Sequence, residues 1–264
     1  MNNLYPFKAS QRRLQRVTLQ PQQTAIALHP QQLLPLTPDQ KHYLINVLRL
    51  ETHAEFIALD SQGGWWRSRL EPDLTTATIL ESIDHNSELT TYLTLGIAMP
   101  KGNNLESVVR QATELGVRQI VPLFSDRTAI KAGTEIGQQK RDRWQRIAAE
   151  TAELSLRSYV PEVCAPQDVH QWLSASPHLS TCPKYICVTH PDQPHLLQCL
   201  REDQAMNSDR LMVVTGCEGG WTEREEQWAI AAGFTPVSLG DRILSAVTAP
   251  VVALSIITAY LDAL

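Results

Sequence analysis

The feature that most constrains this chain is a pair of strand–glycine-turn–helix units within residues 211–249. The first begins with an apolar, β-branched run at 211–214, which has the composition of a buried strand. Three glycines follow within 216–220, where the backbone must take a positive φ or let another group approach closely. Thr222, with a glutamate three residues later, has the spacing of a capping box, which predicts a helix ending near Gly233.

The second unit repeats this order, with a strand at 234–239, a turn at Gly240 and a last helix. Thr248 is expected to be the N-cap of that helix, because Pro250 then falls in the first turn. Ligands of open α/β sheets lie outside the carboxyl ends of the strands, where both glycine turns are placed. Taken alone, the spacing of the glycines is equally compatible with ordinary tight turns, and it is neither a P-loop nor a G-x-G-x-x-G fingerprint.

The 264 residues are enough for two domains. Residues 1 to about 90 are typical of a small β-rich domain, although 42–50 fits a short helix as well as a strand. A polar, turn-rich linker at 84–91 separates domains at 1–86 and 92–264. The second domain alternates strands and helices, which predicts an α/β fold with a mostly parallel sheet. Its further expected elements are strands at 94–98, 119–124 and 185–189, and helices at 105–115 and 138–156.

Composition narrows the cellular compartments in which the protein is expected. No apolar run reaches the roughly 18 residues that a membrane span needs, and the first residues contain no apolar signal segment. The five cysteines are odd in number and form no C-x-x-C pair, which favours reduced thiols in the cytoplasm. A zinc site among the His and Cys residues of 178–199 is the less favoured alternative, because zinc ligands are usually spaced in tighter pairs.

The net charge of −5 is unevenly distributed. Residues 1–50 hold six basic side chains against one acidic side chain, which indicates either a nucleic-acid footprint or a solvated basic face. Residues 61–66 are expected to form a loop that carries Trp65 and Trp66 beside Arg67 and Arg69, and aromatic rings interleaved with arginine suit single-stranded RNA. The alternative is that at least one of these tryptophans packs inward.

Five separate blocks of the chain, which together span nearly its whole length, resemble the RsmE-type SPOUT methyltransferases. The C-terminal blocks are TGCEGGWTEREE and LGDRILSAVTA, in which Cys217 replaces a proline and Ser245, Ala246 and Val247 replace Arg-Thr-Glu. The other blocks are HYLINVLRL, KGNNLESVVRQATELGVRQIVPLFSDRT and RWQRIAAETAELSLRSYVPEV.

This resemblance implies a PUA-like β-barrel before a SPOUT α/β domain with a trefoil knot. It also implies transfer of a methyl group from S-adenosylmethionine to N3 of a uridine in small-subunit (16S) ribosomal RNA, by a cytoplasmic homodimer. Methylation of another RNA, and RNA binding without transfer, are the alternatives. The residues expected to bind the cofactor are Thr215, Gly216, Glu218, Gly219, Gly220, Leu239, Gly240, Ile243, Leu244 and Thr248.

N3 of uracil carries a proton at neutral pH, so the reaction needs a base or a cation that stabilises the developing anion. The catalytic candidates are Arg127, Glu153, Arg157 and Arg242, with Glu153 as the base. For each of them a structural ion pair is the alternative, and Glu218 is equally expected to brace its own loop. Arg16, Arg49 and Lys101 are the expected RNA contacts.

Overall fold

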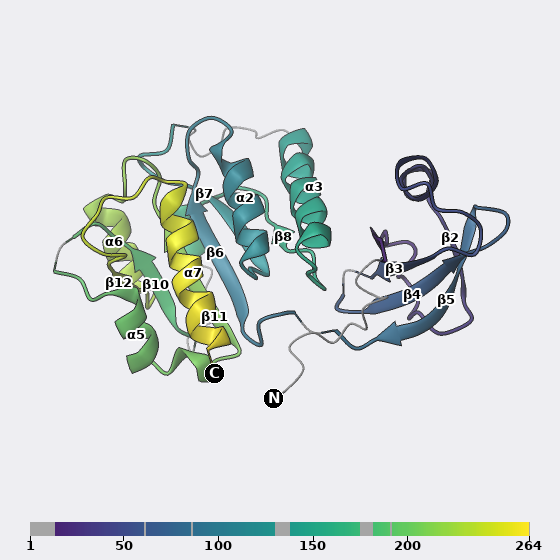
Figure 1. The fold of residues 1–264 in the computed structure, drawn as a ribbon. Helices are drawn as coiled ribbons and strands as arrows, with labels where there is room; N and C mark the ends of the chain where they lie inside the picture. The colour runs from purple at the N-terminus through teal and green to yellow at the C-terminus, as the bar shows by residue number, and fades with distance from the viewer. Residues whose placement is uncertain are drawn as a thin grey trace. The chain divides into compact units, whose positions relative to one another are not determined.

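The structure is a computed structural model that describes residues 14–60, 62–85, 87–129, 138–174, 182–190 and 192–263. Two compact units are present (Figure 1). The first comprises the chain up to Glu88 together with Glu153–Val160, and the second comprises Leu89–Ala152 and Pro161–Leu264. A late segment of the chain therefore completes the N-terminal unit, which contiguous sequence blocks do not indicate.

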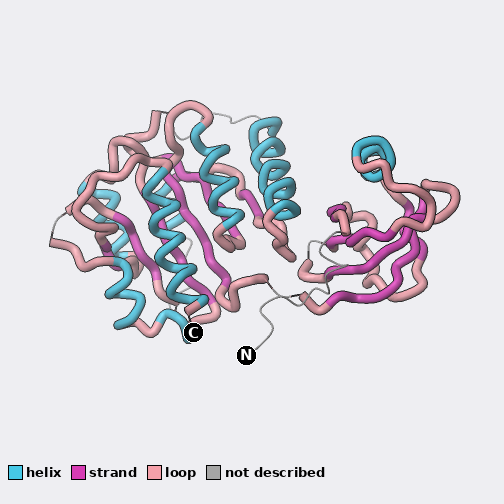
Figure 2. The backbone as a smooth tube through the Cα atoms, in the orientation of Figure 1, coloured by secondary structure: helices cyan, strands magenta, loops and turns pink. Residues whose placement is uncertain are grey.

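The first unit is built on a five-stranded sheet in the order β1-β3-β4-β5-β2. Strands are drawn magenta in Figure 2. The pair β1–β3 is parallel and the other neighbours are antiparallel. Phe56, Leu70 and Ile79 are fully buried in one apolar cluster on this sheet, and Ile57, Leu59 and Trp65 form a second cluster. The strands are β1 (Arg16–Thr18), β2 (Leu33–Pro35), β3 (Glu55–Leu59), β4 (Trp65–Leu70) and β5 (Thr76–Ile83).

The ambiguous stretch at 42–50 is helical over His42–Val47. Thr37 caps helix α1 (Pro38–Lys41) through a capping box with Gln40, and a π-helical turn, His42–Val47, continues it. Pro38 occupies the first turn, where its missing N–H costs nothing. Leu44 is fully buried and fixes this helix to the sheet.

The two adjacent tryptophans lie on β4 rather than in an exposed loop. Trp65 is buried, and its indole N–H donates to Ser158 Oγ at 2.8 Å. Trp66 is half-buried, and its indole N–H donates to Asp60 Oδ2 at 3.1 Å. The prediction that one ring packs inward is confirmed. The interpretation of the pair as an exposed stacking platform is wrong, because Trp65 belongs to the core; Ser61 lies outside the described residues.

The second unit is organised on a parallel sheet in the order β12-β10-β11-β6-β7-β8, with β9 also beside β7. Every described strand pair of this sheet is parallel, as the alternation of strands and helices predicts. The strands are β6 (Tyr92–Ala98), β7 (Gln119–Phe124), β8 (Glu162–Val163), β9 (Gln167–Asp168), β10 (Lys184–Cys187), β11 (Arg210–Thr215) and β12 (Thr235–Val237).

Helices cover both faces of this sheet. Met212 and Val214 pack in one apolar cluster with Trp172 and Ala229, on the face of α4 and α6. On the other face α7, drawn yellow in Figure 1, contacts β11, α2 and α5. The helices are α2 (Asn104–Glu114), α3 (Gln138–Leu154), α4 (Val169–Ser174), α5 (Leu196–Glu202), α6 (Glu223–Ala231) and α7 (Thr248–Asp262), with a 3₁₀ turn at Ala205–Asn207.

The helix ends test the sequence signals directly. The capping box of Thr222 and Glu225 is present, and Gly233 with φ of 85° follows the end of α6, so both predictions are confirmed. Thr248 is not the N-cap of α7, and that prediction is wrong. Thr248 is the first residue of α7 and Val247 is its N-cap. The side-chain acceptor at this end comes from Ser245, whose Oγ accepts the N–H of Thr248 at 3.1 Å and whose carbonyl accepts the N–H of Ala249 at 2.9 Å.

The described residues contain no helix with the length and apolar composition that crossing a bilayer requires. They also contain no group of three or more His, Cys, Asp or Glu side chains placed to hold a metal ion. His178, one of the possible zinc ligands, lies outside the described residues.

Candidate functional site

The loops that follow β10, β11 and β12 line one cavity of about 400 Å³ at the carboxyl edge of the parallel sheet. The prediction that the two glycine turns come together is thereby confirmed. The loop after β11 contributes Gly216, Gly219 and Gly220, and the loop after β12 contributes Leu239, Gly240, Ile243 and Leu244. Parallel neighbours bring these loops together, although they are more than twenty residues apart in the chain.

The first glycine loop is tightly folded on itself. Gly220 has φ of +67°, and a Cβ added at Gly216 would lie 3.2 Å from the Gly220 Cα. The indole of Trp221, which is 6% exposed, donates to the carbonyl of Cys187 at 3.1 Å. That bond fixes the glycine loop to the end of β10. Burial raises the pKa of the Cys187 thiol to about 12, so this cavity residue is a neutral thiol.

Arg127 braces the same loop from the end of β7. Its Nη1 donates to the carbonyl oxygens of Gly219 and Trp221 at 2.7 and 2.8 Å. A Cβ at Gly219 would lie 3.0 Å from the Arg127 Cβ, so a side chain there would displace the arginine. Arg127 also lines the cavity, so the same guanidinium fixes the glycine loop and borders the space beside it.

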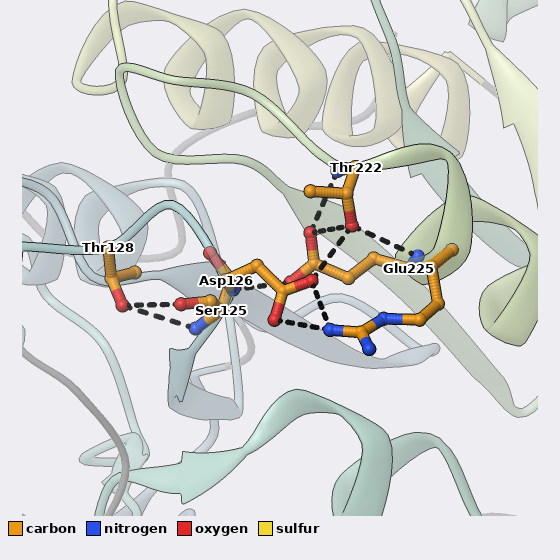
Figure 3. A network of polar contacts seen from close by, with 6 residues as sticks. Ser125, Asp126, Thr128, Thr222 and Glu225 are labelled. Carbon is orange, nitrogen blue, oxygen red and sulfur yellow. Dashed lines mark hydrogen bonds and ion pairs between the residues drawn. The ribbon is translucent and has the colours of Figure 1, made fainter.

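A polar network fixes the start of α6 to the loop after β7 (Figure 3). The buried carboxylate of Glu225 accepts the N–H groups of Asp126 and Thr222 at 2.7 and 2.8 Å. Arg224 closes the network with bonds of 2.8 and 2.9 Å to the Asp126 carboxylate. A buried carboxylate needs such donors, and its position at a helix N-terminus is electrostatically favourable. The network therefore joins the start of α6, which contributes Glu223 and Glu226 to the cavity, to the loop after β7.

Three of the residues expected to bind the cofactor do not line the cavity. Glu218 accepts the backbone N–H of Lys101 at 3.0 Å, so it braces the loop after β6. Thr248 interacts with Ser245 through their hydroxyls at 2.9 Å. Thr215 is fully buried, and its Oγ1 has no hydrogen-bond partner among the described residues.

The four catalytic candidates separate into two groups. Arg127 and Arg242 line the cavity, and Arg242 is exposed there. Arg157 is buried in the first unit and its Nη2 lies 2.6 Å from Glu88 Oε2. Glu153, in the same unit, accepts the hydroxyl of Thr18 at 3.1 Å. Neither Glu153 nor Arg157 lines the cavity.

The expected RNA contacts also differ in their surroundings. Arg49 and Lys101 are exposed, and Arg49 has a positive φ of 56°. Arg16 lies on β1 with its guanidinium 5.8 Å from the ring centre of Trp65. Burial lowers the pKa of Arg16 below its usual value, and the nearby charge of Glu153 offsets only part of this shift. The Arg16 side chain is thus partly buried in the first unit, against Trp65.

A third part of the cavity lining, beside the two glycine loops, was not predicted from the sequence. Val188, Thr189 and His190 follow β10 and line the cavity, as do Glu223 and Glu226 from the first turns of α6. His190 Nε2 lies 3.0 Å from Glu226 Oε2. The only available signal was the strand expected at 185–189, and no sequence pattern showed that it lies between the two glycine units in the sheet.

A parallel sheet with a glycine-lined cavity at its carboxyl edge is the arrangement of a ligand-binding α/β domain. Comparison with known proteins makes the class specific, and the chain belongs to the RNA methyltransferase family. The RNA methyltransferase domain matches residues 87–258, and the RNA methyltransferase PUA domain matches residues 36–79. The trefoil knot that the resemblance implies stays a prediction.

Individual relatives are more specific. The ribosomal RNA small subunit methyltransferase E of Synechocystis sp. is 42% identical over 243 residues, which cover 90% of this chain and 78% of the relative. The protein of the same name from Bacillus subtilis is 29% identical, over 84% and 88% of the two chains. A crystal structure of ribosomal RNA small subunit methyltransferase E from Neisseria gonorrhoeae, bound to S-adenosyl methionine, superposes with a TM-score of 0.79 at 29% identity, covering 94% and 98%.

Proposed function

We propose that this protein transfers a methyl group from S-adenosylmethionine to N3 of a uridine in small-subunit (16S) ribosomal RNA. The observation that carries the proposal is the single cavity formed by the two glycine loops and the end of β10. The names of the relatives, and the ligand in the Neisseria structure, support the choice of substrate and cofactor.

The residues present fit such a cofactor. A volume of about 400 Å³ lies within the range of small-molecule sites. One wall is apolar and suits the flat face of an adenine, with Leu239, Ile243 and Leu244 among its side chains. The glycine loop, which lines the same cavity, allows close approach of a ligand to backbone N–H and C=O groups. When bound, S-adenosylmethionine supplies an electrophilic methyl group on a positively charged sulfur.

The chain itself must bind the uridine and stabilise the charge that appears when N3 loses its proton. Arg242 is suited to this task, because it is exposed at the cavity and a guanidinium can stabilise negative charge on the uracil oxygens. Arg127 is assigned to positioning of the glycine loop. The buried partners of Arg157 and the location of Glu153 favour structural roles for both. The target base must leave its stack to reach this cavity.

RNA binding is assigned to residues 1–86 with Arg16 and Arg49, and to Lys101 in the transferase domain at 92–264. A homodimer in the cytoplasm completes the proposal. Ile243 is 79% exposed beside the cavity, and apolar residues of α7 such as Val251 and Val252 are only half-buried, which suits a subunit interface. Light scattering of the purified chain tests the dimer, and a monomer at micromolar concentration would refute it.

The test of function combines binding and transfer. Calorimetry with S-adenosylmethionine is followed by incubation of the protein with small-subunit RNA and with intact small subunits from a deletion strain. The expected product is one N3-methyluridine, identified by mass spectrometry of nuclease digests and absent from the strain before incubation. Methylation of transfer RNA instead would support the alternative substrate. Cofactor binding without transfer to any RNA would leave the RNA-binding alternative.

A further inference from the structure

The polar wall of the cavity carries a histidine–glutamate pair that neither the glycine loops nor the bracing network uses. Glu226 lies on α6, one turn after Glu223, and His190 follows β10. His190 Nε2 lies 3.0 and 3.2 Å from the two carboxylate oxygens of Glu226. The Glu226 side chain is only 19% exposed, whereas that of His190 is 54% exposed, so the histidine lies on the outer side.

Glu226 is suited to accept more than one hydrogen bond. A carboxylate offers about four lone-pair positions, and a single N–H from His190 leaves acceptor capacity on both oxygens. Its neighbour Glu225 is fully buried and already accepts backbone donors, so successive glutamates of one helix serve different purposes. Glu226 is thus the least exposed carboxylate of the cavity wall, because Glu223 and Asp241 are both exposed.

The same cavity is lined by the apolar side chains of Leu239, Leu244, Ala246 and Ala249, from the loop after β12 and the start of α7. A ligand that contacts both these side chains and Glu226 needs a flat apolar part and, beside it, hydroxyl or other donor groups. A nucleoside has this distribution, with the base as the apolar part and the two ribose hydroxyls as donors. Carboxylates that accept from ribose hydroxyls are an established solution in nucleotide-binding sites of other folds.

We propose that Glu226 accepts hydrogen bonds from the ribose hydroxyls of the adenosyl ligand, and that His190 is a positioning residue that orients the Glu226 carboxylate. The inference rests on the proposed function, since it needs an adenosyl ligand in this cavity. It predicts a site that discriminates ligands with a free 2′,3′-diol from ligands that lack it. Other charged groups of the cavity are Arg127, Arg242 and the two exposed acids, and none of them is bonded to this pair among the described contacts.

The experiment is calorimetric and needs no turnover. Binding of S-adenosylhomocysteine is compared with binding of its 2′,3′-dideoxy analogue, so each protein yields one affinity ratio. We expect the wild-type protein to prefer the hydroxylated ligand roughly tenfold or more, because hydrogen bonds to a charged group are strong. Glu226→Gln should reduce this ratio at least severalfold. Glu223→Gln is the matched control, since it removes the same charge one turn away and should leave the ratio unchanged.

Two histidine variants keep the proposal testable if Glu226→Gln is unstable. His190→Ala should lower the ratio, and His190→Gln, whose amide can still donate to the carboxylate, should restore most of it. An equal loss of affinity for both ligands in Glu226→Gln would overturn the proposal, and so would an unchanged ratio. A wild-type protein that binds neither ligand would refute the methyl-donor site itself, an outcome distinct from loss of discrimination alone.

Discussion

Replacing Arg157 with alanine removes one half of a buried ion pair. The Arg157 and Glu88 side chains are 3% and 6% exposed, and Nη2 lies 2.6 Å from Glu88 Oε2, with Nε at 3.1 Å from both oxygens. Glu88 also accepts the N–H groups of Ser158 and Tyr159 at 2.7 and 3.2 Å. The alanine variant leaves a buried carboxylate without its cation, which costs about 3–5 kcal/mol of unfolding free energy.

Urea denaturation followed by circular dichroism measures that loss. The control is Arg67→Ala in the same unit, because the Arg67–Glu81 pair has side chains 31% and 51% exposed and should contribute at most about 1 kcal/mol. Affinity for S-adenosylhomocysteine should be retained in folded Arg157→Ala protein, because Arg157 does not line the cavity. The structural assignment would be refuted by a variant that keeps its stability and ligand affinity but loses methyl transfer.

Three further predictions test the cavity and one surface turn. Trp221→Phe removes the donor to a carbonyl at the end of β10, and calorimetry and denaturation should show weaker ligand binding and a loss of about 1–2 kcal/mol. Gly219→Ala places a Cβ 3.0 Å from the Arg127 Cβ, so displacement of that arginine should weaken binding of S-adenosylhomocysteine at least severalfold. Asp73 accepts a hydrogen bond from the Thr75 hydroxyl, the main cause of a pKa lowered to about 2. Its folded-state pKa lies below the unfolded value, so its contribution is present above pH 4 and disappears as the pH falls through about 2. Unfolding curves of Asp73→Asn and wild type should therefore converge over this range, and a constant difference would contradict the assignment.

Local signals in the sequence predicted local structure well. Thr222 and Glu225 form the expected cap, and Gly233 follows the end of α6, because these features depend on residues only a few positions apart. The same reasoning failed at Thr248. Both Ser245 and Thr248 are capping residue types, and the choice between them depends on where the loop from Gly240 joins the helix.

Contacts between residues far apart in the chain could not be predicted from the sequence. Arg157 reads equally as a catalytic or a structural cation, and only its burial against Glu88, 69 residues earlier, separates the two. The glycine-rich turn before β4 predicts that Trp65 lies in a loop. Its buried indole instead donates to the hydroxyl of Ser158, 93 residues later in the chain. The third part of the cavity lining was missed for the same reason. His190 gains its position from the order of parallel strands, which no spacing within one segment encodes.

The residues at 217 and 245–247, which depart from the family pattern, have defined contacts in the structure. Ser245 lacks the charge of the usual arginine, but its hydroxyl caps α7 and thereby fixes the loop that forms the apolar wall. Ala246 is 4% exposed and faces the cavity, so a small residue there leaves room for a ligand. Cys217 is buried with its sulfur 3.9 Å from Ser125 Oγ, and the glycines on either side of it keep their places in the cavity wall. These substitutions preserve the walls of the site while removing an arginine and a glutamate, so we expect them to affect contacts with a bound RNA more directly than binding of the methyl donor.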